Sequence, residues 1–181
     1  MKTTLIKVTL AGLLCASLFS TSAQAEQPGI ALTVGSGSDA DIYGVALVSN
    51  NGFWHYEGDR KTWRLIGHLE TSLSNIDGRL SGANEGIVVA GLTPVFRYER
   101  ANFPGYIEAG IGLTYFSEKK IHDSKQVGTH FEFGDILGFG FKFGHLKQHE
   151  VGYRVVHYSN AGISKNNPGI DFHELRVKIG F

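Results

Sequence analysis

Apolar and polar side chains alternate along much of this chain, and the alternation restricts its possible folds more than any other feature. In the segment 105–117, one set of alternate residues is apolar and the other is small or polar. The apolar set is Ile107, Ala109, Ile111, Leu113 and Tyr115, and the other set is Glu108, Gly110, Gly112 and Thr114. Successive side chains of a β-strand point to opposite faces. The first set therefore suits lipid and the second a narrow barrel interior, which predicts a transmembrane strand.

Seven further segments show the same pattern, each with roughly the ten residues of a transmembrane strand. No stretch has a helical period, and no repeat or linker divides the chain. The 24 glycines, 12 phenylalanines and 7 tyrosines, with only 4 prolines, favour β-structure with aromatic girdles. The sequence thus predicts an all-β fold, an eight-stranded antiparallel transmembrane β-barrel of the bacterial outer membrane. The eight predicted strands are roughly 29–37, 41–49, 62–74, 86–99, 105–117, 129–144, 149–159 and 171–181.

Both chain ends indicate export to the outer membrane. Residues 1–25 have the layout of a secretory signal peptide: positive residues precede a short apolar run, and Ala23-Gln24-Ala25 gives a small-residue cleavage site. The one cysteine, Cys15, lies in that segment, so the mature chain is predicted to have no disulfide. Phe181 ends an alternating segment, as in the signal recognised by the barrel-assembly machinery. We therefore predict a cleaved signal peptide over 1–25 and a barrel domain over 26–181 in the cell outer membrane.

Several charged residues fall on the predicted inner face, among them Glu70, Glu108 and Arg154. Buried charges are costly unless they are paired, so we expect a hydrogen-bonded polar network that fills the lumen. The even strand count predicts that both termini lie in the periplasm and that the connection 160–170 lies outside the cell. The connection 50–61 is then a longer periplasmic turn than such barrels usually have.

The balance of charge bears on the partners. The 17 basic and 17 acidic residues cancel, which argues against a nucleic-acid partner. The lipid bilayer is the expected partner, and a homodimer stays open.

Strand parity brings three polar residues together on the face that should contact lipid. In the seventh segment Arg154 belongs inside, so His157 and Ser159 point outward; counting back from Phe181, Asp171 points outward in the eighth. Residues two apart on one strand, and direct neighbours across two strands, lie close together. A serine nucleophile needs a base, and the base needs an acid. Ser159, His157 and Asp171 are therefore a candidate catalytic triad, although near the membrane surface they could equally be polar rim residues, which cost only ~0–1 kcal/mol there.

The surrounding motif favours the catalytic interpretation. The stretch RVVHYSNAGI at 154–163, continued by NPGID at 167–171, resembles the C-terminal signature of the PagL family of outer-membrane lipid A 3-O-deacylases. The resemblance implies an eight-stranded barrel that cleaves the ester-linked acyl chain at position 3 of lipid A, with its site facing the outer leaflet. Lipid A or lipopolysaccharide would then be the substrate.

The resemblance also assigns roles to individual residues. It implies His157 as the base, Ser159 as the nucleophile and Asp171 as the acid, with Asn160 and Gly162 in the region that stabilises the oxyanion. The best-known member of the family has Glu at the acid position, so Glu174 is a rival to Asp171, although parity points it inward.

An ester hydrolase of this kind is expected to need no cofactor and no metal. The main alternative is a non-enzymatic small barrel, an adhesin or structural protein, and a second is an acyltransferase or phospholipase barrel. The sequence leaves the acyl-chain length preference undecided.

Overall fold

A computed structural model describes residues 27–49, 52–58, 60–165 and 167–181. The signal peptide predicted over 1–25 lies outside these residues and stays a prediction. Within the described ranges, no helix is long and apolar enough to span a membrane.

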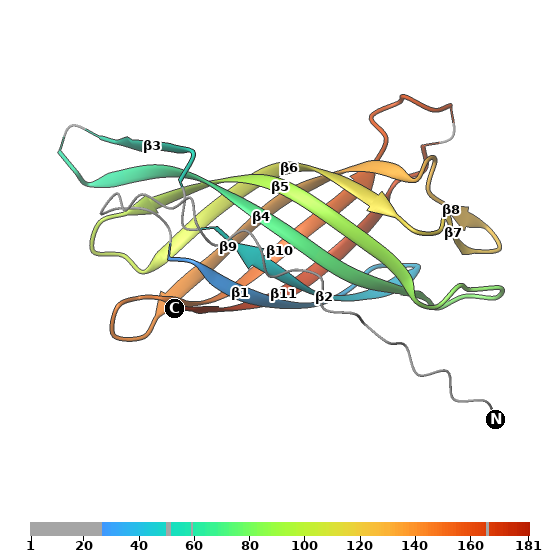
Figure 1. The fold of residues 1–181 in the computed structure, drawn as a ribbon, viewed down its shortest axis with the longest axis horizontal. Helices are drawn as coiled ribbons and strands as arrows, with labels where there is room; N and C mark the ends of the chain where they lie inside the picture. Colours follow the sequence, from blue (N-terminus) through green and yellow to red (C-terminus); the bar gives the residue numbers. More distant parts are fainter. Residues whose placement is uncertain (1–26, 50–51, 59, 166) are drawn as a thin grey trace, which may run out of the picture.

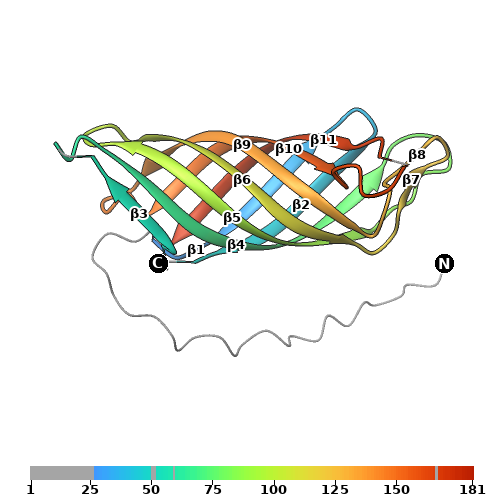
Figure 2. The same ribbon diagram turned by 90° about the horizontal axis from the view of Figure 1, so that it is seen from above.

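Eight long antiparallel strands form a closed barrel, which confirms the predicted fold (Figure 1, Figure 2). Each strand pairs with its neighbour in the order β2-β1-β11-β10-β9-β6-β5-β4, and β2 also pairs with β4, which closes the sheet. The strands are β1 (Gly29–Ser36), β2 (Ala40–Val48), β4 (Trp63–Gly78), β5 (Ile87–Arg100), β6 (Gly105–Phe116), β9 (Phe131–Phe143), β10 (His149–Ser159) and β11 (Ile170–Gly180).

The first and last described segments meet at one end of the barrel, which we call the terminal end. Gly29 pairs with Gly180, and the Phe181 amide donates a hydrogen bond to the Pro28 carbonyl at 3.1 Å. The opposite, distal end carries the connections after β1, β4, β6 and β10 (Figure 1). This agrees with the prediction that both termini lie on one side, and we expect the distal end to be extracellular.

Three short strands were not predicted. The connection 50–61 was predicted to be a turn, but it contains β3 (Trp54–Glu57), which pairs with residues 64–67 at the start of β4. Aromatic packing explains the addition: Trp54 stacks on Tyr56 and meets Phe96 edge-on.

At the distal end, β7 (Lys120–His122) and β8 (Lys125–Gln126) form a small hairpin. In addition, β4 runs to Gly78 rather than to residue 74 as predicted.

Paired charges fill the middle of the lumen, as predicted from Glu70, Glu108 and Arg154. Arg154 donates two hydrogen bonds to Glu70, both at 2.8 Å, and a third to Glu108 at 2.6 Å. Arg176 donates to the same Glu70 at 2.9 Å. Arg97 bridges Glu108 to the next carboxylate, Glu150. Each of these six buried charges therefore has an opposite charge beside it, which offsets the cost of burial.

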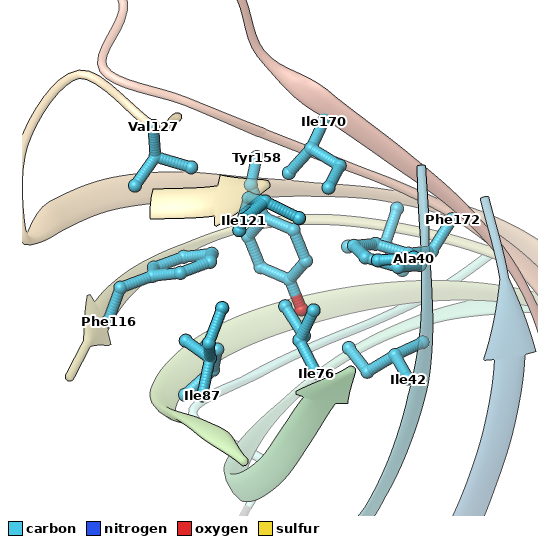
Figure 3. Close-up of a cluster of buried hydrophobic side chains, with 12 residues drawn as sticks. Ala40, Ile42, Ile76, Ile87, Phe116, Ile121, Val127, Tyr158, Ile170 and Phe172 are labelled. Atoms are coloured by element: carbon cyan, nitrogen blue, oxygen red, sulfur yellow. The ribbon is translucent and has the colours of Figure 1, made fainter. Parts of the chain in front are cut away.

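The distal part of the lumen is apolar, and there the prediction of a polar filling is wrong. Figure 3 shows the side chains that converge there, which we call the distal cluster. Tyr158 is at its centre, edge-on to Phe116 and Phe172. Aromatic and aliphatic side chains, each at most 8% exposed, occupy this end in place of the network. The cluster consists of Ala40, Ile42, Ile76, Ile87, Val89, Phe116, Ile121, Val127, Val156, Tyr158, Ile170 and Phe172.

The β7–β8 hairpin is held over the distal cluster by ion pairs to Asp39. His122 Nε2 lies 3.4 Å and Lys125 Nζ lies 3.7 Å from the carboxylate oxygens of Asp39. Partial burial would raise the pKa of Asp39, but the hydrogen bond from Ser38 and the positive charge of Lys125 and His122 outweigh it and lower that pKa. Ile121 in β7 and Val127, directly after β8, belong to the cluster.

Glu70 should be a main source of barrel stability. Glu70→Ala leaves the guanidinium groups of Arg154 and Arg176 without their shared carboxylate, so we expect the free energy of unfolding to fall by about 3–5 kcal/mol. Urea unfolding of the refolded protein in detergent micelles measures this. The control Glu118→Ala removes an exposed carboxylate at the distal end. Equal unfolding midpoints for the two variants would contradict the account.

Candidate active site on the outer wall of β10 and β11

The parity predicted for the last two strands is confirmed. In β10, Arg154, Val156 and Tyr158 are buried in the lumen, and the alternate residues, which include His157 and Ser159, face outward. In β11, Asp171 is exposed, whereas Glu174 is only 7% exposed and points into the lumen. The barrel wall therefore separates Glu174 from His157, and Asp171 lies on the same face as His157.

His157 and Asp171 form a hydrogen-bonded pair. They are direct partners across the β10–β11 ladder, and His157 Nδ1 lies 2.6 Å from Asp171 Oδ1. Because an aspartate accepts this bond, the imidazole carries its proton on Nδ1 and leaves Nε2 as the basic nitrogen. The side chain of Asp171, one methylene shorter than that of Glu, reaches His157 Nδ1 because the two residues are directly opposite each other.

Ser159 is on the same face, two residues along β10 from His157. Among the described residues, no hydrogen bond joins the Ser159 hydroxyl to the imidazole. Bonds between a nucleophile and its base are often long without substrate and tighten when substrate binds. The structure thus brings the three candidate residues onto one surface and joins two of them directly.

Asn160 organises the loop that follows Ser159. Its side chain is buried, and its Oδ1 accepts hydrogen bonds from the amides of Gly162 at 3.0 Å and Ser164 at 3.4 Å. The backbone N–H of Asn160 donates a hydrogen bond to Asn167 Oδ1 at 2.8 Å. Asn160 and Gly162 were both predicted to stabilise an oxyanion. In the structure both take part in bonds within the loop, and their role towards an oxyanion stays a prediction.

Gly169 packs against the imidazole of His157, a contact that sequence reasoning missed. It has a left-handed backbone, with φ +61°. A Cβ atom there would lie 2.6 Å from His157 Cε1 and 3.2 Å from Nε2. Only glycine gives both this conformation and this close approach. Gly169 therefore sets one side of the space that the imidazole occupies.

Asp135 is a second carboxylate beside His157, on the side opposite Asp171. It is the direct partner of His157 across the β9–β10 ladder. Its neighbours Gly134 and Ile136 line the lumen, so Asp135 faces outward. The alternation of segment 129–144 would have placed it there, because it has the same parity as Leu137 and Phe139.

A further polar pair lies on the same wall. Tyr153 Oη and His173 Nδ1 are 2.5 Å apart, and their rings stack. Val155, the residue directly opposite His173, separates this pair from His157 along β10.

The triad is on an open wall rather than in a cavity. A cavity of about 380 Å³ lies at the terminal end, between residues such as Trp63, Arg64, Glu99 and Lys142, and none of the triad residues lines it. Within the described residues, no group of three histidine, cysteine or acidic side chains is arranged to hold a metal.

Known proteins are similar to this chain over most of its length. The family model "Lipid A 3-O-deacylase (PagL)" matches residues 43–179. A lipid A deacylase PagL of Pseudomonas aeruginosa is 34% identical over 131 residues, which cover 68% of this chain and 73% of that protein. The PagL of Bordetella bronchiseptica is 42% identical over 95 residues, covering 51% of this chain and 49% of that protein.

A solved structure is similar as well. The crystal structure of the outer membrane enzyme PagL has a TM-score of 0.70 and 30% sequence identity. The match covers 84% of this chain and 99% of the solved one.

Gly169→Ala should break the contact between His157 and Asp171. The added methyl group overlaps the imidazole, so the proton on His157 Nδ1 should lose the downfield NMR resonance of a hydrogen bond to a carboxylate. Gly162→Ala is the matched control. Its backbone is also left-handed, with φ +78°, but a Cβ atom there meets nothing within 4 Å. A resonance that survives in both variants would show that Gly169 does not position the imidazole.

Proposed function

Since this chain belongs to the PagL family of lipid A 3-O-deacylases, we propose that Ser159, His157 and Asp171 carry out its reaction as a serine-type triad on the lipid-facing wall. The chain is an outer-membrane β-barrel enzyme, a hydrolase that acts on an ester of lipid A. The bond cleaved is proposed to be the ester that joins a 3-hydroxyacyl chain to position 3 of lipid A. The non-enzymatic adhesin considered from sequence alone would not account for the family match.

One observation supports this assignment most strongly: the 2.6 Å hydrogen bond between His157 and Asp171 on the outer wall, on the face that also carries Ser159. Ionisable groups that face hydrocarbon are costly and are by default candidates for function. A triad requires the acid to fix the tautomer of the base, and this bond leaves His157 Nε2 as the atom that can accept a proton.

The proposed reaction has two halves. His157 Nε2 takes the proton of the Ser159 hydroxyl, and Ser159 Oγ attacks the ester carbonyl carbon. The negative charge that forms on the carbonyl oxygen is stabilised by donors from Asn160 and Gly162, for which the loop would have to reorient an amide towards the substrate. The bond to the sugar oxygen then breaks, and His157 returns its proton to that oxygen. In the second half, His157 takes a proton from water, whose oxygen attacks the acyl-serine ester. The bond between the acyl carbon and Ser159 Oγ breaks, His157 returns the proton to Ser159 Oγ, and the fatty acid is released.

The apolar surroundings of the triad suit a substrate that diffuses within the membrane. Exposed apolar side chains, including Leu137, Phe139 and Val151, continue from the triad along β9 and β10 towards the terminal end. An acyl chain of lipid A can lie against them while the sugar stays at the membrane surface. We place the distal end, and with it the triad, in the outer leaflet.

We also propose how the chain reaches that membrane. Residues 1–25 would be removed as a signal peptide, and Phe181, exposed at the terminal end, would be recognised by the barrel-assembly machinery.

Removing the nucleophile or the base should abolish deacylation. Ser159→Ala and His157→Ala are each expected to lower the rate by about 10⁴-fold or more, because the triad acts as a unit. Mass spectrometry of lipid A from cells that express each variant measures the loss of one 3-hydroxyacyl chain. Ser164→Ala, in the adjoining loop, is the control that should retain activity. Deacylation that continues without Ser159 would refute the serine mechanism.

The identity of the acid can be tested separately. Asp171→Asn should impair activity by about 10²- to 10⁴-fold, because an amide holds the imidazole in the wrong tautomer. Glu174→Gln should leave the reaction largely intact, since that side chain is inside the barrel. Activity lost in Glu174→Gln but retained in Asp171→Asn would show that the acid has been assigned wrongly.

A further inference from the structure

Asp135 is an acidic side chain on the lipid-facing wall that the proposed mechanism does not use. It lies on β9, directly opposite His157 of β10 and Ile111 of β6. Phe133 and Leu137 are on the same face of β9. Two pairs of polar side chains on this wall are hydrogen-bonded: Asp171 with His157, and Tyr153 with His173. Within the described part of the chain, the Asp135 carboxylate has no hydrogen-bond or ion-pair partner.

A carboxylate at this position needs a hydrogen-bond donor, and a lipid substrate can supply one. Ionised groups that face hydrocarbon are expensive, and those that persist usually serve a substrate or a pathway. A carboxylate accepts hydrogen bonds and donates none. Within the acyl region of the proposed substrate, the donor nearest the ester is the hydroxyl group on the third carbon of the acyl chain.

Distances along the strands match this pairing. Ser159 pairs with Phe133, two residues from Asp135. With about 3.3 Å per residue along a strand and about 4.8 Å between strands, the Cα atoms of Ser159 and Asp135 are about 8 Å apart. The hydroxyl oxygen is three bonds from the ester carbonyl carbon, about 3–4 Å away. Adding the bond to Ser159 Oγ and a hydrogen bond of about 2.8 Å gives about 7–8 Å between Ser159 Oγ and the carboxylate oxygen of Asp135. This is close to the distance between the two Cα atoms, and both side chains project from the same face.

The Tyr153–His173 pair is too far away for the same task. His173 is opposite Val155, four residues from Ser159 along β10, so the Cα atoms of Ser159 and His173 are about 14 Å apart. Beyond Asp135, the outward residues of β9 are Leu137, Phe139 and Phe141, which suit the methylene groups that follow the hydroxylated carbon.

We propose that Asp135 is a specificity-determining residue that accepts a hydrogen bond from the 3-hydroxyl group of the acyl chain to be removed. The proposal rests on the proposed deacylase function and deepens it, because it explains how an open wall distinguishes a 3-hydroxyacyl ester from an unsubstituted one. Asp135 positions the acyl chain, whereas Ser159, His157 and Asp171 cleave the ester bond.

The test compares two esters of one glucosamine lipid that differ only in that hydroxyl group, 3-hydroxytetradecanoyl and tetradecanoyl. The full barrel in detergent micelles is assayed for kcat/KM on both. A hydrogen bond to a charged group predicts that the wild-type protein prefers the hydroxylated ester by about 10- to 100-fold. Asp135→Leu should bring this ratio close to one by slowing only the hydroxylated ester. Asp135→Asn, which keeps an acceptor oxygen, should give an intermediate ratio.

The control variant is Asp77→Leu, the same replacement at an outward-facing residue of β4, where Asp77 hydrogen-bonds to Tyr43 and Asn75 away from the triad. It should keep the wild-type ratio. A wild-type ratio near one, or a full preference in Asp135→Leu, would overturn the proposal. An equal fall on both esters in Asp135→Leu would also overturn it, because Asp135 would then act through His157. A wild-type protein that cleaves neither ester would instead refute the deacylase function, and this proposal with it.

Discussion

The carboxylate of Glu70 holds the guanidinium groups of Arg154 and Arg176, and these two arginines belong to the strands that carry the candidate site. Each arginine points into the lumen from β10 or β11, so the alternate residues of both strands must point towards lipid. The ladder that these strands form then places His157 opposite Asp171. A shift of one residue in β10 would turn His157 and Ser159 inward, and the same shift in β11 would turn Asp171 inward. The outward position of the candidate triad thus depends on a register that ion pairs inside the barrel help to hold.

The distal cluster packs against the inner side of the two strands that carry the candidate site. Tyr158 lies between His157 and Ser159 in sequence and Phe172 follows Asp171, and both rings are buried in the cluster. Tight packing of these inward rings limits the movement of the outward side chains beside them. At the end of β10, Asn160 holds the loop that leads to Gly169 and the imidazole. The wall is therefore backed by packed rings where the three candidate residues lie, and it is apolar where the proposal places the acyl chain.

Strand parity is what made so much of this arrangement predictable. A period of two, counted from Arg154 in one direction and from Phe181 in the other, is enough to place His157, Ser159 and Asp171 outward and Glu174 inward. The same period of two, counted from Leu137 in a third strand, places Asp135 outward. Gly169 could not be recognised in this way, because its importance depends on a contact across the loop. The distal cluster and β3 were missed for a similar reason: tertiary packing and aromatic contacts decide them.

The central claim is that Ser159 on the outer wall is the nucleophile, and covalent labelling tests it most directly. A long-chain alkyl phosphonofluoridate presents a tetrahedral phosphorus to an activated serine, whose oxygen displaces fluoride and stays attached. Peptide mass spectrometry after the inactivation of deacylation should then locate one phosphonyl group on Ser159, and His157→Ala should remove most of the labelling because the base is missing. Inactivation that accompanies a label on another residue, with Ser159 unmodified, would contradict the account.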